Sequence, residues 1–509
     1  MATDAALTIR LNPADNVVVA RADILPGTAI PGETVATRSH VPSGHKLATR
    51  AVKKGEAIRK YNQIIGFATA EIRPGEHVHT QNCEFAIFER AYEHGVDAKP
   101  TQYFTGAAQA TFQGFKRRNG EVGTRNYIGI LSSVNCSAHV SKVLAQKAEQ
   151  TLLKDFPNVD GVVALTHGTG CGMAASGEGI DVLRRTIAGY ARHPNFAGIL
   201  MIGLGCEVNQ IGGILAAEEL EPGPFLHPMT IQDSGGSAST VRVGLERIKE
   251  MLPEVNKAMR STVPAAHITI GLQCGGSDGY SGISANPALG AASDLLVRHG
   301  GSVLLSETPE TYGAEHMLVR RAVSGEVGLK LVELIQWWLA YTEKHGGSMD
   351  NNPSPGNKAG GLTTILEKAL GASAKGGTTN LVDVIHYAAP LRTRGFVFMD
   401  SPGYDPVSAT GQVASGSNMI CFTTGRGSVF GCKPAPSIKL TTNTPLYKRM
   451  PDDMDINCGT VIDGSESVQE AGERIFKLIL EVASGKRTKS EEFGFGEDEF
   501  QPWQIGAVM

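Results

Sequence analysis

The stretch Tyr127-Ile-Gly-Ile-Leu-Ser-Ser-Val134 decides how the larger part of this chain folds, because it is almost wholly apolar and stops abruptly at Asn135-Cys136. A segment of helical length, Ser137–Leu152, follows it. The same succession recurs at Gly161–Thr166, which precedes a second helical-length segment, Glu178–Arg192. Near-continuous apolar strands that alternate with helices indicate a parallel sheet buried on both faces.

The alternation of strands and helices continues to the end of the chain. Strands are predicted before the long helical stretch Tyr312–His345, at Ala197–Leu204, Met229–Gln232, Ile268–Leu272 and Ser302–Ser306. A second series follows at Leu381–Ile385, Gly395–Met399, Met419–Phe422 and Ile438–Leu440, with a last helix at Val468–Ser484. A polar Asn/Pro/Gly segment at 350–361 separates the two series. We therefore expect two α/β domains with parallel sheets, over residues 113–349 and 350–509.

The N-terminal part of the chain has a different pattern. Short apolar stretches such as Asn16-Val-Val-Val-Ala20 and Ile64-Ile-Gly-Phe67 are separated by Pro-Gly and Gly turns. This pattern is typical of short strands in a β-rich domain. We expect such a domain over residues 1–97, followed by a polar linker over residues 98–112.

Composition excludes several classes of protein. A chain of 509 residues that is 41% hydrophobic and 19% charged supports more than one buried core. A net charge of −4 argues against a basic surface for nucleic acid. No signal-peptide pattern opens the chain, and no apolar run approaches the ~20 residues of a membrane helix. We expect a soluble, cytoplasmic protein without nucleic-acid or membrane partners, which forms a homo-oligomer such as a dimer.

Chemically active side chains follow nearly every predicted strand. They are Cys136, His167, Cys171, Cys206, Glu207, Cys274, Ser277, Asp278, Glu307, Thr424 and Arg426. In open parallel sheets, ligands bind outside the carboxyl ends of the strands, where helix N-termini favour anions. We predict that these residues converge on one pocket for a small anion. The alternative is that several of them are helix caps and residues of tight turns.

Two histidines of the N-terminal domain have the spacing of a metal site. His77-Val-His79 places two imidazoles on one face of a strand, because side chains at i and i+2 point the same way. Imidazole pairs suit a first-row divalent metal. His45, in Gly44-His45-Lys46, is a possible third ligand or an acid–base group. Two surface histidines on an edge strand would give the same pattern.

The cysteines allow two interpretations. Cys136, Cys171, Cys206 and Cys274 could ligate an iron–sulfur cluster, although they lack the closely spaced pairs of many cluster sites. Alternatively, each is a small residue packed beside a glycine turn. A disulfide framework is not expected, since the eight cysteines are scattered singly in a large chain.

Two loops present cationic side chains. Asn352-Pro-Ser-Pro-Gly-Asn357-Lys358 is a rigid loop that carries an amide and an ammonium group. Gly425-Arg426-Gly427 carries a guanidinium group, which can bind a carboxylate through two parallel hydrogen bonds. An ordinary surface turn is the alternative for both. Gly203-Leu-Gly205 is not continued as a dinucleotide-binding fingerprint and no Walker A motif is present, so neither NAD nor ATP is predicted.

Several short sequence motifs, in this order along the chain, resemble those of the altronate/galactarate dehydratase family. They are Gly44-His-Lys46, Gly120-Glu-Val-Gly-Thr-Arg-Asn126, Gly203-Leu-Gly-Cys-Glu207, Gln273-Cys-Gly-Gly-Ser-Asp278, Ser284-Ala-Asn-Pro287, Asn352-Pro-Ser-Pro-Gly-Asn-Lys358 and Thr424-Gly-Arg-Gly427. The resemblance spans nearly the whole chain and includes an N-terminal module similar to the β-clip domain called SAF. His77-Val-His79 and the stretch Glu307–Glu315 look more like altronate dehydratases than galactarate dehydratases.

The resemblance implies metal-activated removal of water from a hexonate or hexarate, which gives a 2-keto-3-deoxy acid. It implies Fe2+ or Mn2+, and a site that the N-terminal module shares with the α/β body. On this basis the expected catalytic residues are His45, Lys46, His167, Glu207 and Glu307. The expected substrate-binding residues are Arg125, Asn126, Ser277, Asp278, Asn357, Lys358, Thr424 and Arg426. The expected metal ligands are His45, His77 and His79, with Cys136, Cys171, Cys206 and Cys274 as the alternative.

Two other functions stay open at this point. His167 is followed by Gly-Thr where family members more often have a bulkier pair that includes Tyr. This difference leaves the sugar acid undetermined, so galactarate is the alternative to an altronate-type aldonate. A sugar-acid-binding or regulatory protein without catalysis is the second alternative.

Overall fold

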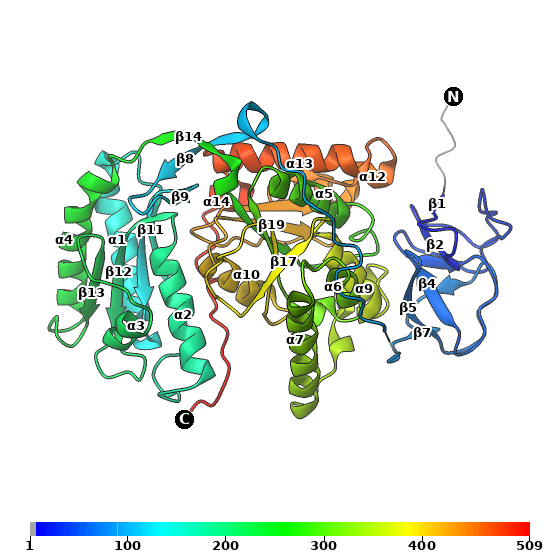
Figure 1. Ribbon diagram of the computed structural model, residues 1–509, viewed down its shortest axis with the longest axis horizontal. Coiled ribbons are helices and arrows are strands. Elements are labelled where there is room, and N and C mark those ends of the chain that lie inside the picture. The colour runs from blue at the N-terminus through cyan, green and yellow to red at the C-terminus, as the bar shows by residue number, and fades with distance from the viewer. Residues whose placement is uncertain (1–6, 89) are drawn as a thin grey trace.

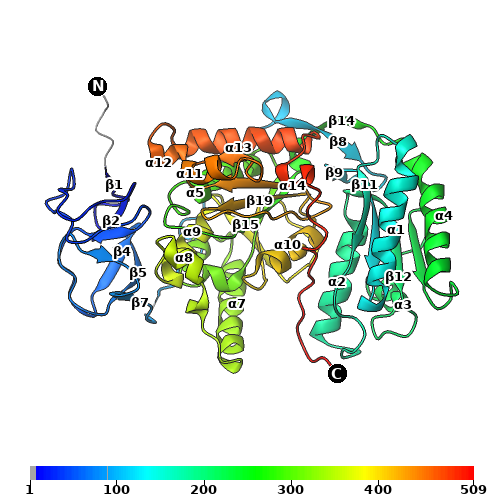
Figure 2. The ribbon, with the colours of Figure 1, turned by 180° about the vertical axis from the view of Figure 1, so that it is seen from behind.

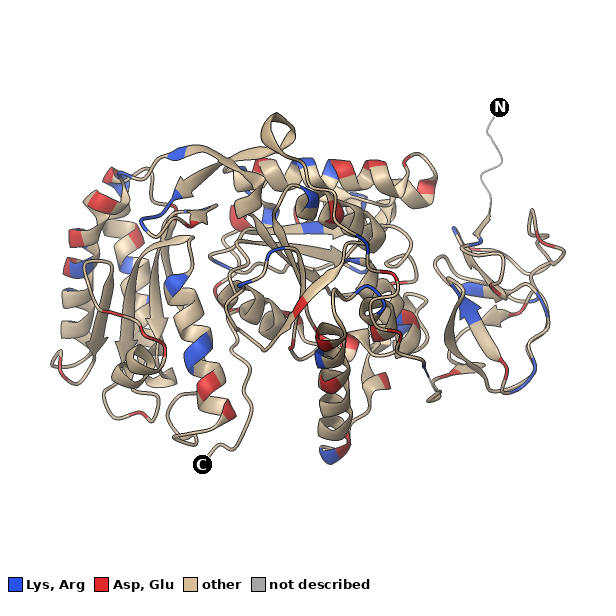
Figure 3. Ribbon diagram, in the orientation of Figure 1, with Lys and Arg blue, Asp and Glu red and all other residues tan. Residues whose placement is uncertain are grey.

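The computed structural model describes residues 7–88 and 90–509, and it arranges them as three bodies in a row (Figure 1). The N-terminal β-rich domain lies at one end and a four-stranded α/β domain lies at the other. The chain then returns to build the larger α/β domain between them. Lys and Arg are interspersed with Asp and Glu across all three bodies (Figure 3).

The N-terminal domain is built from two small antiparallel sheets, as the sequence predicts. The first has the order β1-β2-β3-β6, with β1 (Thr8–Ile9), β2 (Val17–Ala20), β3 (Lys46–Ala48) and β6 (His77–Val78). The second has the order β4-β5-β7, with β4 (Ala57–Lys60), β5 (Gln63–Ala68) and β7 (Cys83–Glu84). Alternate residues of these strands fill a buried core that includes Val17, Ile58, Ile65 and Val78.

The second domain contains the predicted parallel sheet around Tyr127–Ser132. Its order is β11-β10-β12-β13, with β10 (Tyr127–Ser132), β11 (Gly161–Leu165), β12 (Phe196–Gly203) and β13 (Leu226–Thr230). Helices α1 (Ala138–Thr151) and α4 (Ser237–Val255) cover its outer face. Helices α2 (Glu178–Arg192) and α3 (Ile211–Ala217) cover the other face, and α2 also packs against the central domain.

The central domain has one seven-stranded parallel sheet with the order β17-β18-β16-β15-β19-β20-β21. Its strands are β15 (Thr269–Cys274), β16 (Ser302–Leu305), β17 (Leu381–Ile385), β18 (Phe396–Met399), β19 (Met419–Thr424), β20 (Ser437–Thr441) and β21 (Ile456–Asn457). Helices α5 (Ala285–Arg298) and α13 (Val468–Ala483) lie along one face (Figure 2), and α10 (Asp405–Ala414) lies on the other. The other helices are α6 (Glu315–Val319), α7 (Gly325–Lys344), α8 (Pro355–Ala359), α9 (Ile365–Ala374), α11 (Thr444–Arg449), α12 (Thr460–Asp463) and α14 (Lys489–Glu492).

Two features differ from the sequence-based expectations. Strands from both sides of residue 350 pair in the same sheet, since β15 lies beside β19 and β16 lies beside β18. We therefore propose that the α/β domains divide at a small antiparallel sheet of β14 (Arg260–Pro264), β8 (Thr111–Lys116) and β9 (Val122–Gly123). The stretch 312–345 is not one helix, because the Ser324 hydroxyl accepts the Val327 N–H and starts α7 anew.

Within residues 7–88 and 90–509, no helix has the length and apolar character needed to cross a bilayer.

Candidate functional site

The three histidines of the N-terminal domain form a cluster. His45 immediately precedes β3, and antiparallel pairing of β3 with β6 sets Leu47 opposite His77. As a result, Nδ1 of His45 lies 3.0 Å from Nε2 of His77. One ring nitrogen from each of His45, His77 and His79 falls within 4.8 Å of the others. The structure thus brings together the three residues that the sequence proposes as metal ligands.

Burial keeps these imidazoles uncharged. Burial, reinforced by neighbouring positive groups, lowers the pKa of His77 to about 3 and that of His79 to about 4. The pKa of His45 is also lowered, mainly by burial. Nδ1 of His79 is buried and has no hydrogen-bond partner among the described residues. Three neutral imidazoles with an unsatisfied nitrogen are a donor set that fits a first-row divalent metal.

Two lysines and a glutamate are buried beside the histidine cluster. The Lys46 ammonium donates to the Glu367 carboxylate at 2.8 Å and to the Gly361 carbonyl at 2.6 Å. Lys60, from β4, reaches the other carboxylate oxygen at 3.0 Å. Burial alone would raise the pKa of Glu367, but the two lysines hold it well below its usual range. This ion-paired cluster ties the N-terminal domain to α9, and the sequence analysis missed both Lys60 and Glu367.

The histidine cluster lies against the carboxyl edge of the seven-stranded sheet. Nε2 of His45 is 3.3 Å from the carbonyl of Ala359, the last residue of α8. The Tyr280 hydroxyl, in the loop after β15, lies 2.6 Å from the Ser43 hydroxyl and donates to the Ala20 carbonyl at 2.8 Å. The N-terminal domain and the sheet edge therefore form one site.

Four of the predicted substrate-binding residues hold the loops of this edge in place. The buried Asp278 carboxylate accepts hydrogen bonds from Thr442 at 2.9 Å and Asn443 at 3.1 Å. The Ser277 carbonyl accepts the Asn357 amide at 2.9 Å, and the Thr424 hydroxyl accepts the Gly427 N–H at 3.0 Å. These hydrogen bonds hold the loops of the sheet edge in position.

Two cations remain available at the same edge. Arg426 is exposed, and its Cδ lies 3.3 Å from the position of a Cβ built on Gly360. Lys358 lies close enough to His79 that its charge contributes to lowering the pKa of that imidazole. In the described part of the chain, neither cation is paired with a carboxylate. Both are suited to bind an anionic ligand.

A second buried cluster lies at the ends of β15 and β16. The Cys274 sulfur lies 3.0 Å from a Glu310 oxygen and 2.8 Å from the Lys375 nitrogen. Lys368 pairs with Glu310 at 2.7 Å. Burial, together with the nearby Glu310 carboxylate, raises the pKa of Glu307 well above its usual value.

This second cluster adjoins the first. A small cavity between them is lined by Lys60, Glu367, Lys368, Cys274 and Ser277. The sequence analysis named Cys274 and Glu307 as site residues but not Glu310, Lys368 or Lys375. Glu310 carried a signal, since it lies inside the stretch 307–315.

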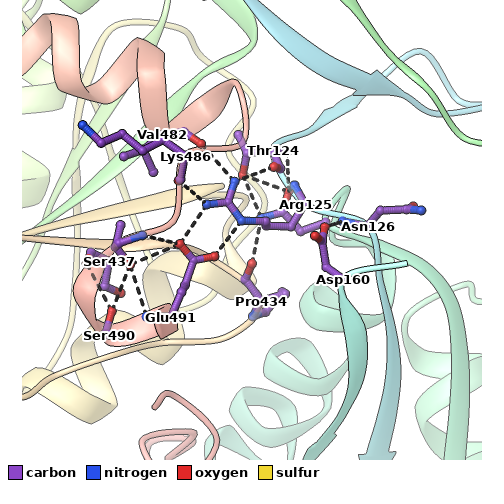
Figure 4. Close-up of polar contacts among 12 residues, drawn as sticks. Thr124, Arg125, Asn126, Asp160, Pro434, Ser437, Val482, Lys486, Ser490 and Glu491 are labelled. Carbon is purple, nitrogen blue, oxygen red and sulfur yellow. Dashed lines mark hydrogen bonds and ion pairs between the residues drawn. The ribbon is translucent and has the colours of Figure 1, made fainter. Parts of the chain in front are cut away.

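Arg125 and Asn126 are not at this site, and their predicted substrate-binding role is wrong. Figure 4 shows Arg125 between the second and central domains, with its guanidinium directed at Glu491. It donates to both Glu491 oxygens, at 2.6 and 2.8 Å, and to three backbone carbonyls, so all five of its N–H groups are used. The Asn126 amide donates to the Asn158 and Val255 carbonyls. Both residues hold the domain junction.

His167 and Glu207 lie elsewhere, at the carboxyl edge of the four-stranded sheet (Figure 1). His167 bonds the Ser132 carbonyl at 2.9 Å and accepts the Thr169 N–H at 3.3 Å. Glu207 accepts the Ser133 hydroxyl at 2.7 Å and the Gly205 N–H at 2.6 Å. The prediction of one shared pocket is therefore wrong, because the two sheets have separate carboxyl edges.

The four predicted cysteine ligands are divided between the two edges. Cys136, Cys171 and Cys206 lie on loops of the four-stranded sheet, whereas Cys274 ends β15 of the seven-stranded sheet. They do not form a single ligand set.

Comparison with known proteins agrees with the resemblance over the whole chain. Residues 6–86 match the altronate/galactarate dehydratase SAF domain, residues 114–256 the second domain of D-galactarate dehydratase/altronate hydrolase, and residues 265–508 the C-terminal domain of D-galactarate/altronate dehydratase.

Full-length relatives show the same extent of similarity. Altronate dehydratase of Bacillus subtilis is 34% identical over 96% of this chain and 97% of its own length. Galactarate dehydratase (L-threo-forming) of Escherichia coli is 38% identical, over 97% and 96% respectively. Altronate dehydratase of Escherichia coli is 34% identical, over 96% and 97%. With three domains in the family's order and a shared site between the first and the last, the chain belongs to the altronate/galactarate dehydratase family of hydro-lyases.

Proposed function

We propose that this enzyme is a metal-dependent dehydratase that converts an altronate-type aldonate into a 2-keto-3-deoxy acid. The observation that carries the proposal is the cluster of His45, His77 and His79 at the junction with the sheet edge. Galactarate is the second candidate substrate, because the galactarate dehydratase of Escherichia coli is 38% identical to this chain.

The histidine cluster would hold the metal, Fe2+ or Mn2+, through one ring nitrogen of each residue. When bound, the metal supplies Lewis-acid stabilisation of the carboxylate and hydroxyl oxygens of the substrate. Arg426 and Lys358 bind carboxylate or hydroxyl oxygens of the sugar acid, since both are free of carboxylate partners in the described chain.

Two proton transfers complete the elimination. The proton α to a carboxylate is weakly acidic, so a base must be positioned against it. We assign this step to His45, in which case His77 and His79 hold the metal without it, because one imidazole nitrogen cannot bind the ion and take the proton at once. Lys46 is not the base, since its ammonium is held by Glu367 and the Gly361 carbonyl. Glu307 suits the acid that protonates the departing hydroxyl, because burial raises the pKa of its carboxyl.

The direct test is a substrate panel. The protein, loaded without oxygen with Fe2+ or with Mn2+, is incubated with altronate, galactarate and other aldonates and aldarates. Mass spectrometry then detects the 2-keto-3-deoxy product. We expect turnover of altronate, and turnover of galactarate alone would favour the second candidate. Binding of sugar acids without loss of water from any of them would favour the sugar-acid-binding protein and overturn the proposed function.

The metal site has a test of its own. We expect His79→Ala to lose most of the bound Mn2+, measured as metal content after gel filtration, and to lower turnover by at least about 100-fold. His40→Ala is the matched control, because His40 is an exposed histidine of the same domain. Full metal occupancy in His79→Ala would mean that the histidine cluster is not the metal site.

A further inference from the structure

The exposed cysteines of this protein are gathered in one place. Of the eight cysteines, Cys136, Cys171 and Cys206 are exposed and the other five are buried. Each of the three follows a strand of the four-stranded sheet, after β10, β11 and β12 respectively. In this sheet β10 lies between β11 and β12, and all three strands run parallel. The three thiols therefore emerge on neighbouring loops at a single edge.

Hydrogen bonds brace these three loops against one another. The Asn135 N–H donates to the Thr169 carbonyl at 3.0 Å, and the Asn209 N–H donates to the Gly170 carbonyl at 3.0 Å. The Asn209 side chain also donates to the Ser133 carbonyl at 3.0 Å. Asn135 and Gly170 are each one residue from a cysteine, so the braces fix the cysteine positions directly.

The two predicted catalytic residues of this edge belong to the same bracing. His167 links the β11 loop to Ser132, and Glu207 links the β12 loop to Ser133. Gly170 has a φ of +98°, and a Cβ there would lie 2.4 Å from the Ser133 carbonyl oxygen, so the loops can approach this closely only with glycine. Such rigidity around exposed, reactive side chains is what a metal site requires of its surroundings.

We propose that Cys136, Cys171 and Cys206 together bind an iron–sulfur cluster through their three thiolates, as a second metal site distinct from the histidine cluster. Cys136 lies in the turn that leads into α1, a helix of 14 residues. Three thiolates leave one iron of a four-iron cluster without a protein ligand.

The three thiols do not have the close spacing of a single-ion site. Around one tetrahedral ion, thiolates at about 2.3 Å from the metal lie about 3.8 Å apart. Among residues 7–88 and 90–509, the groups whose ligand atoms all lie within 4.8 Å of one another are the histidine cluster and the group of Cys274, Glu307 and Glu310. The three exposed thiols are therefore spaced more widely than one ion needs. A closed zinc site would also need a fourth protein ligand, and Glu207 is already occupied by Ser133 and Gly205.

An open cleft adjoins this edge. It has a volume of about 930 Å³ and is lined by Asn135 and His167 on one side and by Trp338, Phe500 and Trp503 on the other. A cleft of this size admits a small organic anion. The three cysteines are themselves exposed, so the iron that lacks a protein ligand would be accessible from solution.

The full-length protein, produced with added iron and purified without oxygen, tests the inference. We expect a brown protein with visible absorption, about four irons and four acid-labile sulfides per chain beyond any metal at the histidines, and loss of both in air. Cys136→Ser, Cys171→Ser and Cys206→Ser should each lower the sulfide content at least fivefold. Cys458→Ala, which changes a buried cysteine, is the matched control and should keep it.

Several outcomes would overturn the inference. These are a colourless protein without labile sulfide even after reconstitution with Fe2+ and sulfide, a single bound zinc, a disulfide among the three residues, and an unchanged cluster in all three serine variants. Thermal melting of each variant shows whether lost sulfide reflects lost fold, and His79→Ala should keep the cluster. A brown protein that dehydrates no acid of the panel would overturn only the proposed function, whereas a colourless, active protein would overturn only this inference.

Discussion

His193, at the end of α2, shows how a single buried side chain couples stability to pH. Its Nε2 lies 3.1 Å from the Ser417 carbonyl, and its Nδ1 accepts the Asn195 N–H at 3.1 Å. Burial is the main reason that the pKa of His193 falls to about 4. In the unfolded chain a histidine titrates near 6.5, so the unfolded state binds the proton first as pH falls. The stability that neutral His193 contributes is complete above pH 6.5 and is lost as pH falls toward 4.

We therefore expect the shifted pKa of His193 to lower the unfolding free energy by about 2 kcal/mol when the pH falls from 8 to 5. One pKa unit corresponds to about 1.4 kcal/mol. His193→Gln offers a donor and an acceptor but does not titrate. Urea denaturation at the two pH values should show a smaller loss for the variant than for the parent protein. Equal losses would mean that His193 does not remain neutral in the folded state.

At the same scale, the sequence predicts some site residues well and others not at all. His77 and His79 were identifiable because alternation along a strand is a local rule. Lys60 and Glu367 were not, because each is a lone charge in its own segment, and the two become a pair only after β4 and α9 pack together. Arg125 belongs to one of the sequence motifs that resemble the family. Its role nevertheless depends on Glu491, which lies 366 residues away in the chain.

At the scale of elements, Arg125 fixes the short helix α14 against the start of β10. The guanidinium is 2% exposed, and the Glu491 side chain is 9% exposed. Breaking a buried ion pair from one side leaves the other charge without a partner and costs about 3–5 kcal/mol. We expect Arg125→Met to lower the unfolding free energy by about this amount, measured by chemical denaturation, and to make the junction after α13 more sensitive to protease.

The matched control is an exposed ion pair, Lys142–Asp498, whose side chains are 48% and 87% exposed. Lys142→Met should change stability by less than about 1 kcal/mol, because exposed pairs contribute little. A double-mutant cycle with Glu491→Gln isolates the coupling of Arg125 to Glu491. Similar losses of unfolding free energy in Arg125→Met and Lys142→Met would contradict the role of Arg125 in holding α14 against the start of β10.

The strands and helices were predictable from the sequence, but which strands lie beside one another in a sheet was not. The strands around Tyr127–Ser132 were expected because apolar runs alternate with helical segments. The order β17-β18-β16-β15-β19 joins strands from both sides of residue 350, and no local pattern encodes which strands pair. The expected boundary at 350 followed a polar loop, which here connects elements within one domain and carries Asn357 and Lys358 to the site.

At the scale of the whole molecule, two sheets give two carboxyl edges, and only the edge of the seven-stranded sheet meets the N-terminal domain. Composition could suggest that strand-end residues share a pocket, but it could not reveal that they belong to separate sheets. The division matters for function, because the histidine cluster depends on the packing of two domains. The three exposed cysteines depend on the second domain alone.

Gly361 offers a test of that packing. Its φ is +104°, and a Cβ there would lie 2.5 Å from the Gly44 carbonyl oxygen and 3.3 Å from Cδ2 of His45. Its own carbonyl accepts the Lys46 ammonium. We expect Gly361→Ala to push the N-terminal domain away from the sheet edge, lower dehydration turnover by at least about tenfold and weaken Mn2+ binding, measured by titration calorimetry. Gly416→Ala separates this effect from backbone strain, because Gly416 has a φ of +113° and no atom within 4 Å of its Cβ position. That control should lose about 1–2 kcal/mol of stability from the left-handed backbone and keep its turnover and metal affinity. If both variants lost activity equally, strain alone would explain the result, and the contact between the two domains would not be what assembles the site.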